Sequence, residues 1–239
     1  MIKIDILVFA AHPDDAELSC SGTILSHINK GYKVGIVDLT KGELGTRGNA
    51  ELRMIEANNA SKILGLHFRE NLGFEDCFFK KDKTHLMKAI EMIRKYQPEI
   101  VLCNAQSDRH TDHAKAGDLI HEACFLSGLR KIETNLAGEI QKEWRPKAVY
   151  HYIQDQYTKP DMIVDITPFF DKKMESILAF SSQFYDPNSV EPLTPISNPE
   201  FITLLKGRAI EFGRQIGVTY GEGFTVQRNI GTSNLFNLI

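Results

Sequence analysis

Short apolar runs that alternate with longer amphipathic segments constrain the fold of this chain more than any other feature. The first run, Ile4–Ala10 (IDILVFA), has the nearly continuous apolar pattern of a strand buried on both faces. Comparable runs occur at 34–39, 99–104, 148–153 and 162–166, with a shorter one at 67–72. Each of these runs predicts a β-strand.

Helical periodicity fills the intervals between these strands. Apolar residues three and four positions apart predict helices at 15–29, 50–64, 84–96, 112–126, 169–180 and 198–213. Strands and helices alternating at this spacing predict an α/β fold: a Rossmann-like, mostly parallel twisted sheet with helices on both faces. Residues 185–199, rich in Pro, Ser and Asn, are expected to form one long surface loop.

Length and charge narrow the class of protein. The 239 residues fit a single domain, 1–239, with a core over about 1–130 and a pocket-completing C-terminal part over about 131–239. The net charge of −3 argues against a nucleic-acid partner, which usually requires a basic surface. No stretch approaches the ~20 apolar residues of a membrane helix, and the four cysteines are scattered. We therefore expect a cytoplasmic protein with free thiols and no membrane partner.

Two clusters of imidazole and carboxylate groups follow predicted strands. His12, Asp14 and Asp15 come directly after the first strand, and His110 and His113 come a few residues after the fourth. Ligands of doubly wound sheets bind at the carboxyl ends of the strands, so both clusters are expected at one rim. Either cluster alone would also suit an ordinary helix start, because Pro and acidic residues favour the first turn. The two together predict a metal site.

His12, Asp15 and His113 form a candidate ligand set for one zinc ion. A catalytic zinc site typically has three imidazole, carboxylate or thiolate ligands and an open position for water. Asp14 is then left as an unliganded carboxylate beside the ion. It is suited to accept a proton from a water molecule that the ion has made more acidic.

Two further residues of the second cluster are candidates for catalysis. His110 is placed to stabilise a developing oxyanion or to protonate a leaving amine. Asp112 could accept a hydrogen bond from a histidine ring and fix its tautomer. A metal-dependent phosphoesterase, which generally uses two metals, and a non-catalytic sugar- or metal-binding module stay as alternatives. Nucleotide binding is disfavoured, because no Gly-rich phosphate loop follows the first strand.

Several segments carry a resemblance to a known family. They are 11–17 (AHPDDAE), 109–113 (RHTDH), 41–48 (KGELGTRG), 51–53 (ELR) and 220–224 (YGEGF). With these motifs the chain resembles the LmbE/PIG-L family of zinc-dependent N-acetylglucosaminyl deacetylases along nearly its whole length. Segments 107–110 (SDRH), 164–167 (VDIT) and 182–184 (SQF) look most like the branch that deacetylates N-acetylglucosaminyl malate in bacillithiol biosynthesis.

The resemblance implies an amidohydrolase that acts on a small-molecule N-acetylglucosamine conjugate. It implies one Zn²⁺ per chain on His12, Asp15 and His113, with Fe²⁺ as the alternative ion. Asp14 is implied as general base and His110 as electrostatic partner or acid. N-acetylglucosaminyl malate is the first candidate substrate, and another N-acetylglucosamine conjugate or a chitooligosaccharide is the second. Family members often form trimers or hexamers, so a homo-oligomer is expected.

Charged residues near the same rim are candidates for substrate recognition. Glu43, Arg47 and Arg53 follow the second strand in a Gly-rich segment. Arginine suits bidentate capture of a carboxylate, and a malyl group offers two. The resemblance supports Arg53 as a contact and Glu43 as a partner of sugar hydroxyls. The alternative for Arg47 and Arg53 is that they are solvated or pair with Glu51 and Glu56.

Arg109 is a fourth candidate substrate contact. It stands where the mycothiol branch of the family carries a tyrosine. If Arg109 does not replace that hydroxyl, another group must donate the hydrogen bond to the oxyanion. The less regular second half offers residues that could wall the pocket, although each is more often structural: Arg130, Tyr152, Gln154 and Tyr185.

Overall fold

The computed structural model describes residues 3–238, so residues 1, 2 and 239 of the expected domain lie outside the described part. The strands are β1 (Ile6–Ala10), β2 (Val34–Thr40), β3 (Phe68–Phe74), β4 (Ile100–Cys103), β5 (Asn135–Leu136), β6 (Glu139–Ile140), β7 (Ala148–Tyr152), β8 (Met162–Asp165) and β9 (Gly221–Thr225). The helices are α1 (Asp15–Asn29), α2 (Ala50–Leu64), α3 (Lys83–Tyr96), α4 (Thr111–Leu126), α5 (Phe170–Leu178) and α6 (Phe201–Gln215), with short 3₁₀ turns at Thr167–Phe169 and Leu235–Asn237.

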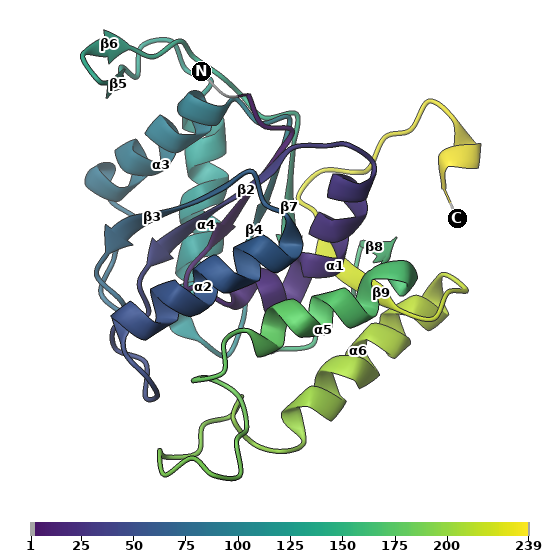
Figure 1. The fold of residues 1–239 in the computed structure, drawn as a ribbon. Coiled ribbons are helices and arrows are strands. Elements are labelled where there is room, and N and C mark those ends of the chain that lie inside the picture. The colour runs from purple at the N-terminus through teal and green to yellow at the C-terminus, as the bar shows by residue number, and fades with distance from the viewer. Residues whose placement is uncertain (1–2, 239) are drawn as a thin grey trace.

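A seven-stranded sheet of order β3-β2-β1-β4-β7-β9-β8 runs through the molecule (Figure 1). β1 pairs in parallel with β2 and β4, and Val8 lies opposite Ile36 and Leu102. β3 and β7 extend the parallel sheet outward, whereas β9 is antiparallel to β7 and β8. The predicted α/β fold with a mostly parallel sheet is confirmed. Strand order reverses between β1 and β4, and ligands of such sheets bind at that position.

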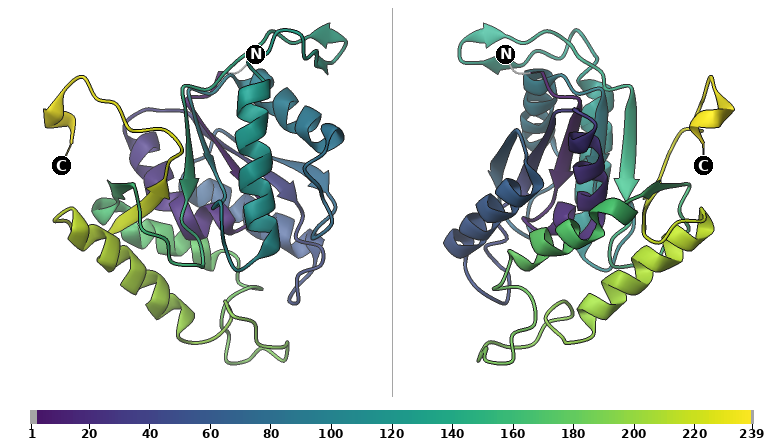
Figure 2. Two further views of the ribbon diagram at one scale, coloured as in Figure 1. Left: turned by 180° about the vertical axis from the view of Figure 1, so that it is seen from behind. Right: turned by 45° about the vertical axis from the view of Figure 1, so that its right-hand side comes forward.

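Successive side chains of β1 point to opposite faces of the sheet and enter different cores. Leu7 and Phe9 pack with residues of α3 and α4, and Val8 and Ala10 pack with residues of α1. In Figure 1, α2 and α5 lie in front of the sheet and α4 behind it, and the view from behind in Figure 2 brings α4 forward. Burying one such aliphatic side chain contributes about 1.5–3 kcal/mol, so packing on both faces holds the strand ends in place.

Helix α1 is broken at Cys20, whose φ of −142° and ψ of 15° are not helical. Glu222 of β9 accepts hydrogen bonds from the backbone N–H groups of Gly22 and Thr23, at 2.9 and 2.7 Å, just beyond the break. Lys173 of α5 donates to the same carboxylate at 2.7 Å and balances its charge in the interior. The 220–224 motif thus caps the second half of α1 from another part of the chain.

The sequence patterns missed β9 and the β5–β6 hairpin. β9 reads GEGFT and has no apolar run; it is a strand because β7 and β8 both pair with it. A Cβ at Gly221 would lie 2.7 Å from Ile163 Cγ2, and one at Gly223 would lie 2.9 Å from the Phe212 ring, so close packing requires glycine. The last helix begins at Phe201, after a turn, instead of at the expected residue 198.

The structure bears on membrane-spanning segments and on the state of the cysteines. No helix in the stretch from residue 3 to 238 is both long and apolar enough to cross a bilayer. All four cysteines are free thiols: Cys20, Cys103 and Cys124 are buried, and Cys77 is exposed.

A buried ion cluster ties β3 to β2 and α1. Arg69 donates to both carboxylate oxygens of Asp38, at 2.6 and 2.9 Å, and to Glu17 at 2.6 Å. The three side chains are at most 3% exposed. Burial raises the pKa of Asp38 to about 6, although the Arg69 guanidinium lowers it.

We predict that Arg69→Met lowers the free energy of unfolding by about 3–5 kcal/mol, because it leaves two buried carboxylates without their cation. The loss should be larger at pH 7 than at pH 5. The pKa of Asp38 already lies above its ordinary 3.8 and rises further without Arg69, so the folded state binds the extra proton and loses stability as pH rises. Urea unfolding at the two pH values measures both effects.

The matched control is Lys81→Met, which removes a cation from a solvent-exposed pair with Asp118. Exposed pairs contribute little, so a much smaller change is expected. Equal losses in the two variants would contradict a stabilising role for the buried cluster.

Candidate metal centre

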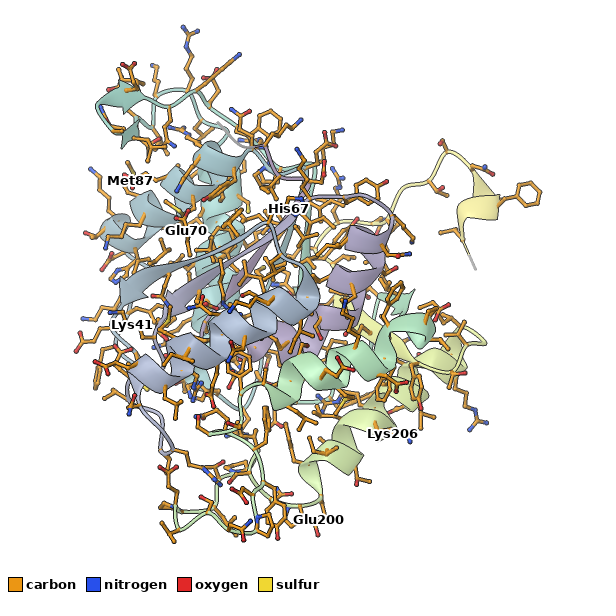
Figure 3. The ribbon with its side chains drawn as sticks, viewed as in Figure 1. Lys41, His67, Glu70, Met87, Glu200 and Lys206 are labelled. Carbon is orange, nitrogen blue, oxygen red and sulfur yellow. The ribbon has the colours of Figure 1, made fainter. Side chains whose placement is uncertain are left out.

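A cleft at the carboxyl ends of the strands holds both predicted clusters. Lys41, which follows β2, and His67, which precedes β3, lie at opposite ends of the sheet (Figure 3). The cleft is at the Lys41 end, because Gly42 is one of the residues that line it. The cleft encloses about 1140 Å³ together with the solvent at its mouth. Eight of the candidate residues line it: His12, Asp14, Asp15, Arg53, Arg109, His110, His113 and Gln154.

Asp15 lies between the two histidines that were predicted to share a metal ion with it. Its Oδ1 is 3.0 Å from His113 Nε2, and its Oδ2 is 3.6 Å from His12 Nδ1. All three residues are at most 9% exposed. The loop after β1 supplies His12, the first residue of α1 is Asp15, and the first turn of α4 supplies His113, so the two motifs lie side by side.

Each of these histidines has a carboxylate at its other ring nitrogen. His12 Nε2 is 3.0 Å from Asp76, and His113 Nδ1 is 2.5 Å from Asp108. Carboxylates in such positions fix the tautomer and orientation of metal-binding histidines. Sequence reasoning assigned no role to Asp76 or Asp108. The signal for Asp76 was its place two residues after β3, at the same rim.

His110 and Asp112 occupy the start of α4. The backbone N–H of Asp112 donates to His110 Nδ1 at 3.2 Å, so a neutral His110 ring carries its proton on Nε2. Burial and the nearby His12 and His113 lower the pKa of His110, which favours this neutral form. Asp112 Oδ2 lies 3.4 Å from His12 Nε2, farther than Asp76.

Asp14 lies beside the group and accepts a hydrogen bond from Arg53 at 3.1 Å. Arg53 also donates to the carbonyl of Pro13 at 3.1 Å, which ties α2 to the loop after β1. Asp14 has a φ of 126°, a conformation that L-residues rarely adopt, at the tight junction between β1 and α1. Burial raises its pKa to about 7, against the lowering effect of Arg53, which brings this carboxyl into the range of a general base.

Two overlapping groups of donors are spaced to hold a divalent cation, and neither of them includes Asp15. His12 lies with His110 and His113 in one group of closely spaced ligand atoms, and with Asp76 and Asp112 in another. Burial alone would lower the pKa of His113, but Asp15 and Asp108 raise it to about 9. The buried carboxylates thus attract positive charge to the position between the rings. Nitrogen and oxygen ligands of this kind suit Zn²⁺ and also Fe²⁺.

The candidate substrate contacts divide into two pairs. Arg53 and Arg109 line the cleft. Glu43 accepts a hydrogen bond from the backbone N–H of Asp76 at 2.9 Å and does not line the cleft. Arg47 is also off the cleft wall, where it donates to Ser189 in the 185–199 loop at 2.9 Å. The structure therefore does not bring Glu43 and Arg47 to the cleft.

The fold and this cluster define a class of protein: an α/β protein with a buried histidine–aspartate cluster at the rim of its sheet. The family model described as GlcNAc-PI de-N-acetylase, PIG-L, matches residues 7–124. An uncharacterized deacetylase of Escherichia coli, YaiS, is 32% identical over 160 residues, which cover 64% of this chain and 83% of that protein. The chain belongs to the PIG-L family and is a deacetylase, an amidohydrolase.

Other relatives extend the match beyond the family model. The diacetylchitobiose deacetylase of Thermococcus kodakarensis is 27% identical over 229 residues, 91% of this chain and 81% of that protein. A probable N-acetyl-alpha-D-glucosaminyl L-malate deacetylase 2 of Bacillus anthracis is 23% identical over 192 residues, covering 75% and 81%. The crystal structure of a conserved protein from Thermus thermophilus has a TM-score of 0.85 and 34% identity, covering 97% of this chain and 98% of that one.

We predict that His113→Ala lowers the zinc content of purified protein well below that of wild type, because the change removes one of three ligands. Metal analysis after exhaustive dialysis measures it. His85→Ala, the same change on α3 outside the cleft, is the control and should retain wild-type zinc. Full zinc content in His113→Ala together with loss in His110→Ala would contradict the ligand set and favour His110 as the third ligand.

Proposed function

We propose that this deacetylase hydrolyses the N-acetyl group of an N-acetylglucosamine conjugate, with N-acetylglucosaminyl malate as its preferred substrate. The observation that carries the proposal is the place of Asp14: a buried carboxylate in the cleft beside the His12–Asp15–His113 group. A module that only binds sugar or metal has no need of such a group. The description of the family model supports an N-acetylglucosamine substrate.

His12, Asp15 and His113 would hold one divalent cation, with zinc as the first candidate and Fe²⁺ as the alternative. When bound, such an ion acts as a Lewis acid toward an acyl carbonyl and makes a nearby water molecule more acidic. Asp76 and Asp108 keep the two imidazole rings oriented toward this position.

Asp14 then carries the proton transfers, and His110 acts on the developing oxyanion. Asp14 accepts a proton from the attacking water molecule as the water oxygen forms a bond to the acetyl carbon. The Nε2–H of His110 donates a hydrogen bond to the carbonyl oxygen, where negative charge develops. The C–N bond breaks as the sugar nitrogen takes from Asp14 the proton that this carboxyl received from water, and acetate and a free amine are released.

In this proposal, Arg109 and Arg53 bind the carboxylates of the malyl group. Arg109 is 49% exposed at the cleft, and its Nε pairs with Asp155 at 2.5 Å. Within the described residues its two terminal nitrogens have no hydrogen-bond partner, so they can receive a carboxylate. The Bacillus anthracis relative supports malate, and the Thermococcus kodakarensis relative favours a chitooligosaccharide as the second candidate.

Asp14→Asn should reduce kcat by about 10²–10⁴-fold, the usual contribution of a general base, while zinc content stays at the wild-type level. Acetate and amine release from N-acetylglucosaminyl malate, with and without a chelator, measures this. Near wild-type turnover in Asp14→Asn would refute the assignment. Phosphate release from phosphoester substrates instead of acetate release would favour a phosphoesterase.

Arg109→Gln should raise the KM for N-acetylglucosaminyl malate about tenfold or more, because a charged hydrogen bond to a carboxylate contributes about 1.5–3 kcal/mol. The KM for diacetylchitobiose, which has no carboxylate, should change little. The test measures the KM of wild type and of Arg109→Gln for each of the two substrates. An equal effect on both, or faster turnover of diacetylchitobiose by wild type, would contradict the assignment of malate.

A further inference from the structure

Three consecutive residues, Gln154, Asp155 and Gln156, follow β7 and lie beside the candidate metal centre, outside its two sequence motifs. They lie beyond residues 7–124, the range that the family model matches. We call them the 154–156 segment. Each of the three makes a different contact: Gln154 bonds to the proposed ligand Asp15, and Gln156 bonds to Asp108, the partner of the proposed ligand His113.

Gln154 holds one of these ligands directly. Its Nε2 donates to Asp15 Oδ1 at 3.1 Å, and its Oε1 accepts from Asn104 Nδ2 at 3.0 Å and from the Ala105 backbone at 3.1 Å. Asn104, directly after β4, donates to Asp15 Oδ2 at 3.0 Å. Gln154 is 5% exposed and Asn104 fully buried. Two amides therefore fix both oxygens of the Asp15 carboxylate.

Gln156 supports the second ligand through its backbone. Its N–H donates to Asp108 Oδ1 at 2.6 Å, and the other oxygen of Asp108 is 2.5 Å from His113 Nδ1. The orientation of the His113 ring therefore depends on where the 154–156 backbone lies. Asp155, between them, pairs with Arg109.

Helix α6 fixes the position of this backbone. Arg208 donates through Nη1 to the carbonyl oxygen of Gln154 and through Nη2 to that of Asp155, the latter at 2.7 Å. The guanidinium thus binds two successive peptide groups, an arrangement that leaves the segment little freedom to shift. Arg208 is partly buried and lines the cleft.

We propose that the 154–156 segment, held by Arg208, is a positioning element that sets the metal affinity of the site by orienting Asp15 and His113. The inference rests on the proposed ligand set and is independent of the substrate. It makes the C-terminal part of the chain a contributor to the metal centre as well as to the cleft wall. Partners that orient metal ligands typically change metal affinity by about 10–100-fold when removed.

The test measures the zinc dissociation constant of the full chain by competition with a chromophoric chelator, without substrate. Gln154→Met keeps the side-chain length but removes the donor to Asp15, and should weaken zinc binding about 10–100-fold. Arg208→Met should weaken it in the same direction, to an intermediate value. Gln141→Met is the matched control: it removes another buried amide, one that donates to the Glu91 carbonyl outside the cleft, so zinc affinity should match wild type.

Thermal unfolding of the metal-free proteins separates positioning from general stability. A merely structural role for Gln154 would lower the metal-free Tm and leave the zinc dissociation constant unchanged, and that result would overturn the proposal. If Gln154→Met does not fold, Gln154→Asn, which withdraws the amide by one methylene, replaces it, with the same outcomes. Failure of wild type to bind zinc would refute the ligand set and this inference together. Zinc binding without deacetylation would refute only the proposed substrate.

Discussion

The hydrogen bonds and ion pairs of the buried Asp15 carboxylate are the interactions on which the proposed metal site depends. It lies within 3.6 Å of nitrogens from both His12 and His113 and receives two amide hydrogen bonds, from Asn104 and Gln154. These partners come from the ends of β1, β4 and β7 and from the first turn of α4. Burying a carboxylate is costly unless it is paired or hydrogen-bonded. These elements must therefore pack together correctly for Asp15 to find its partners, and the same packing assembles the site.

The parallel sheet explains why residues so distant in sequence meet. Paired parallel strands run in the same direction, so their carboxyl ends lie at the same edge of the sheet. The residues that follow β1, β3, β4 and β7 therefore lie along that edge. His12, Asp76, Asn104 and Gln154 each follow one of these strands within two residues. Packing on both faces of the sheet keeps this edge rigid, which the geometry of a metal site requires.

Much of the fold and part of the site could be predicted from the sequence. Apolar runs located β1, β2, β4, β7 and β8 closely, because strands buried on both faces need continuous hydrophobicity. The motifs brought His12, Asp15 and His113 to one place. Periodicity could not find β9, since its two glycines and Glu222 are set by contacts with α6 and α1.

The residues that sequence reasoning missed are those whose roles depend on tertiary contacts. Asp76 and Asp108 orient imidazole rings, and nothing in their local sequence shows which ring lies beside them. Gln154 was considered only as a wall of the pocket, whereas it reaches Asp15. Arg47 had the residue type of a substrate contact, but the 185–199 loop engages it away from the cleft.

An anomalous difference map at the zinc edge, from crystals of the zinc-loaded protein, tests the central claim most directly. The account predicts one peak per chain within bonding distance of His12 Nδ1, Asp15 and His113 Nε2, at about 2.0–2.2 Å from each. A peak bound instead at His12 Nε2 with Asp76 and Asp112, or one with His110 in place of Asp15, would contradict it.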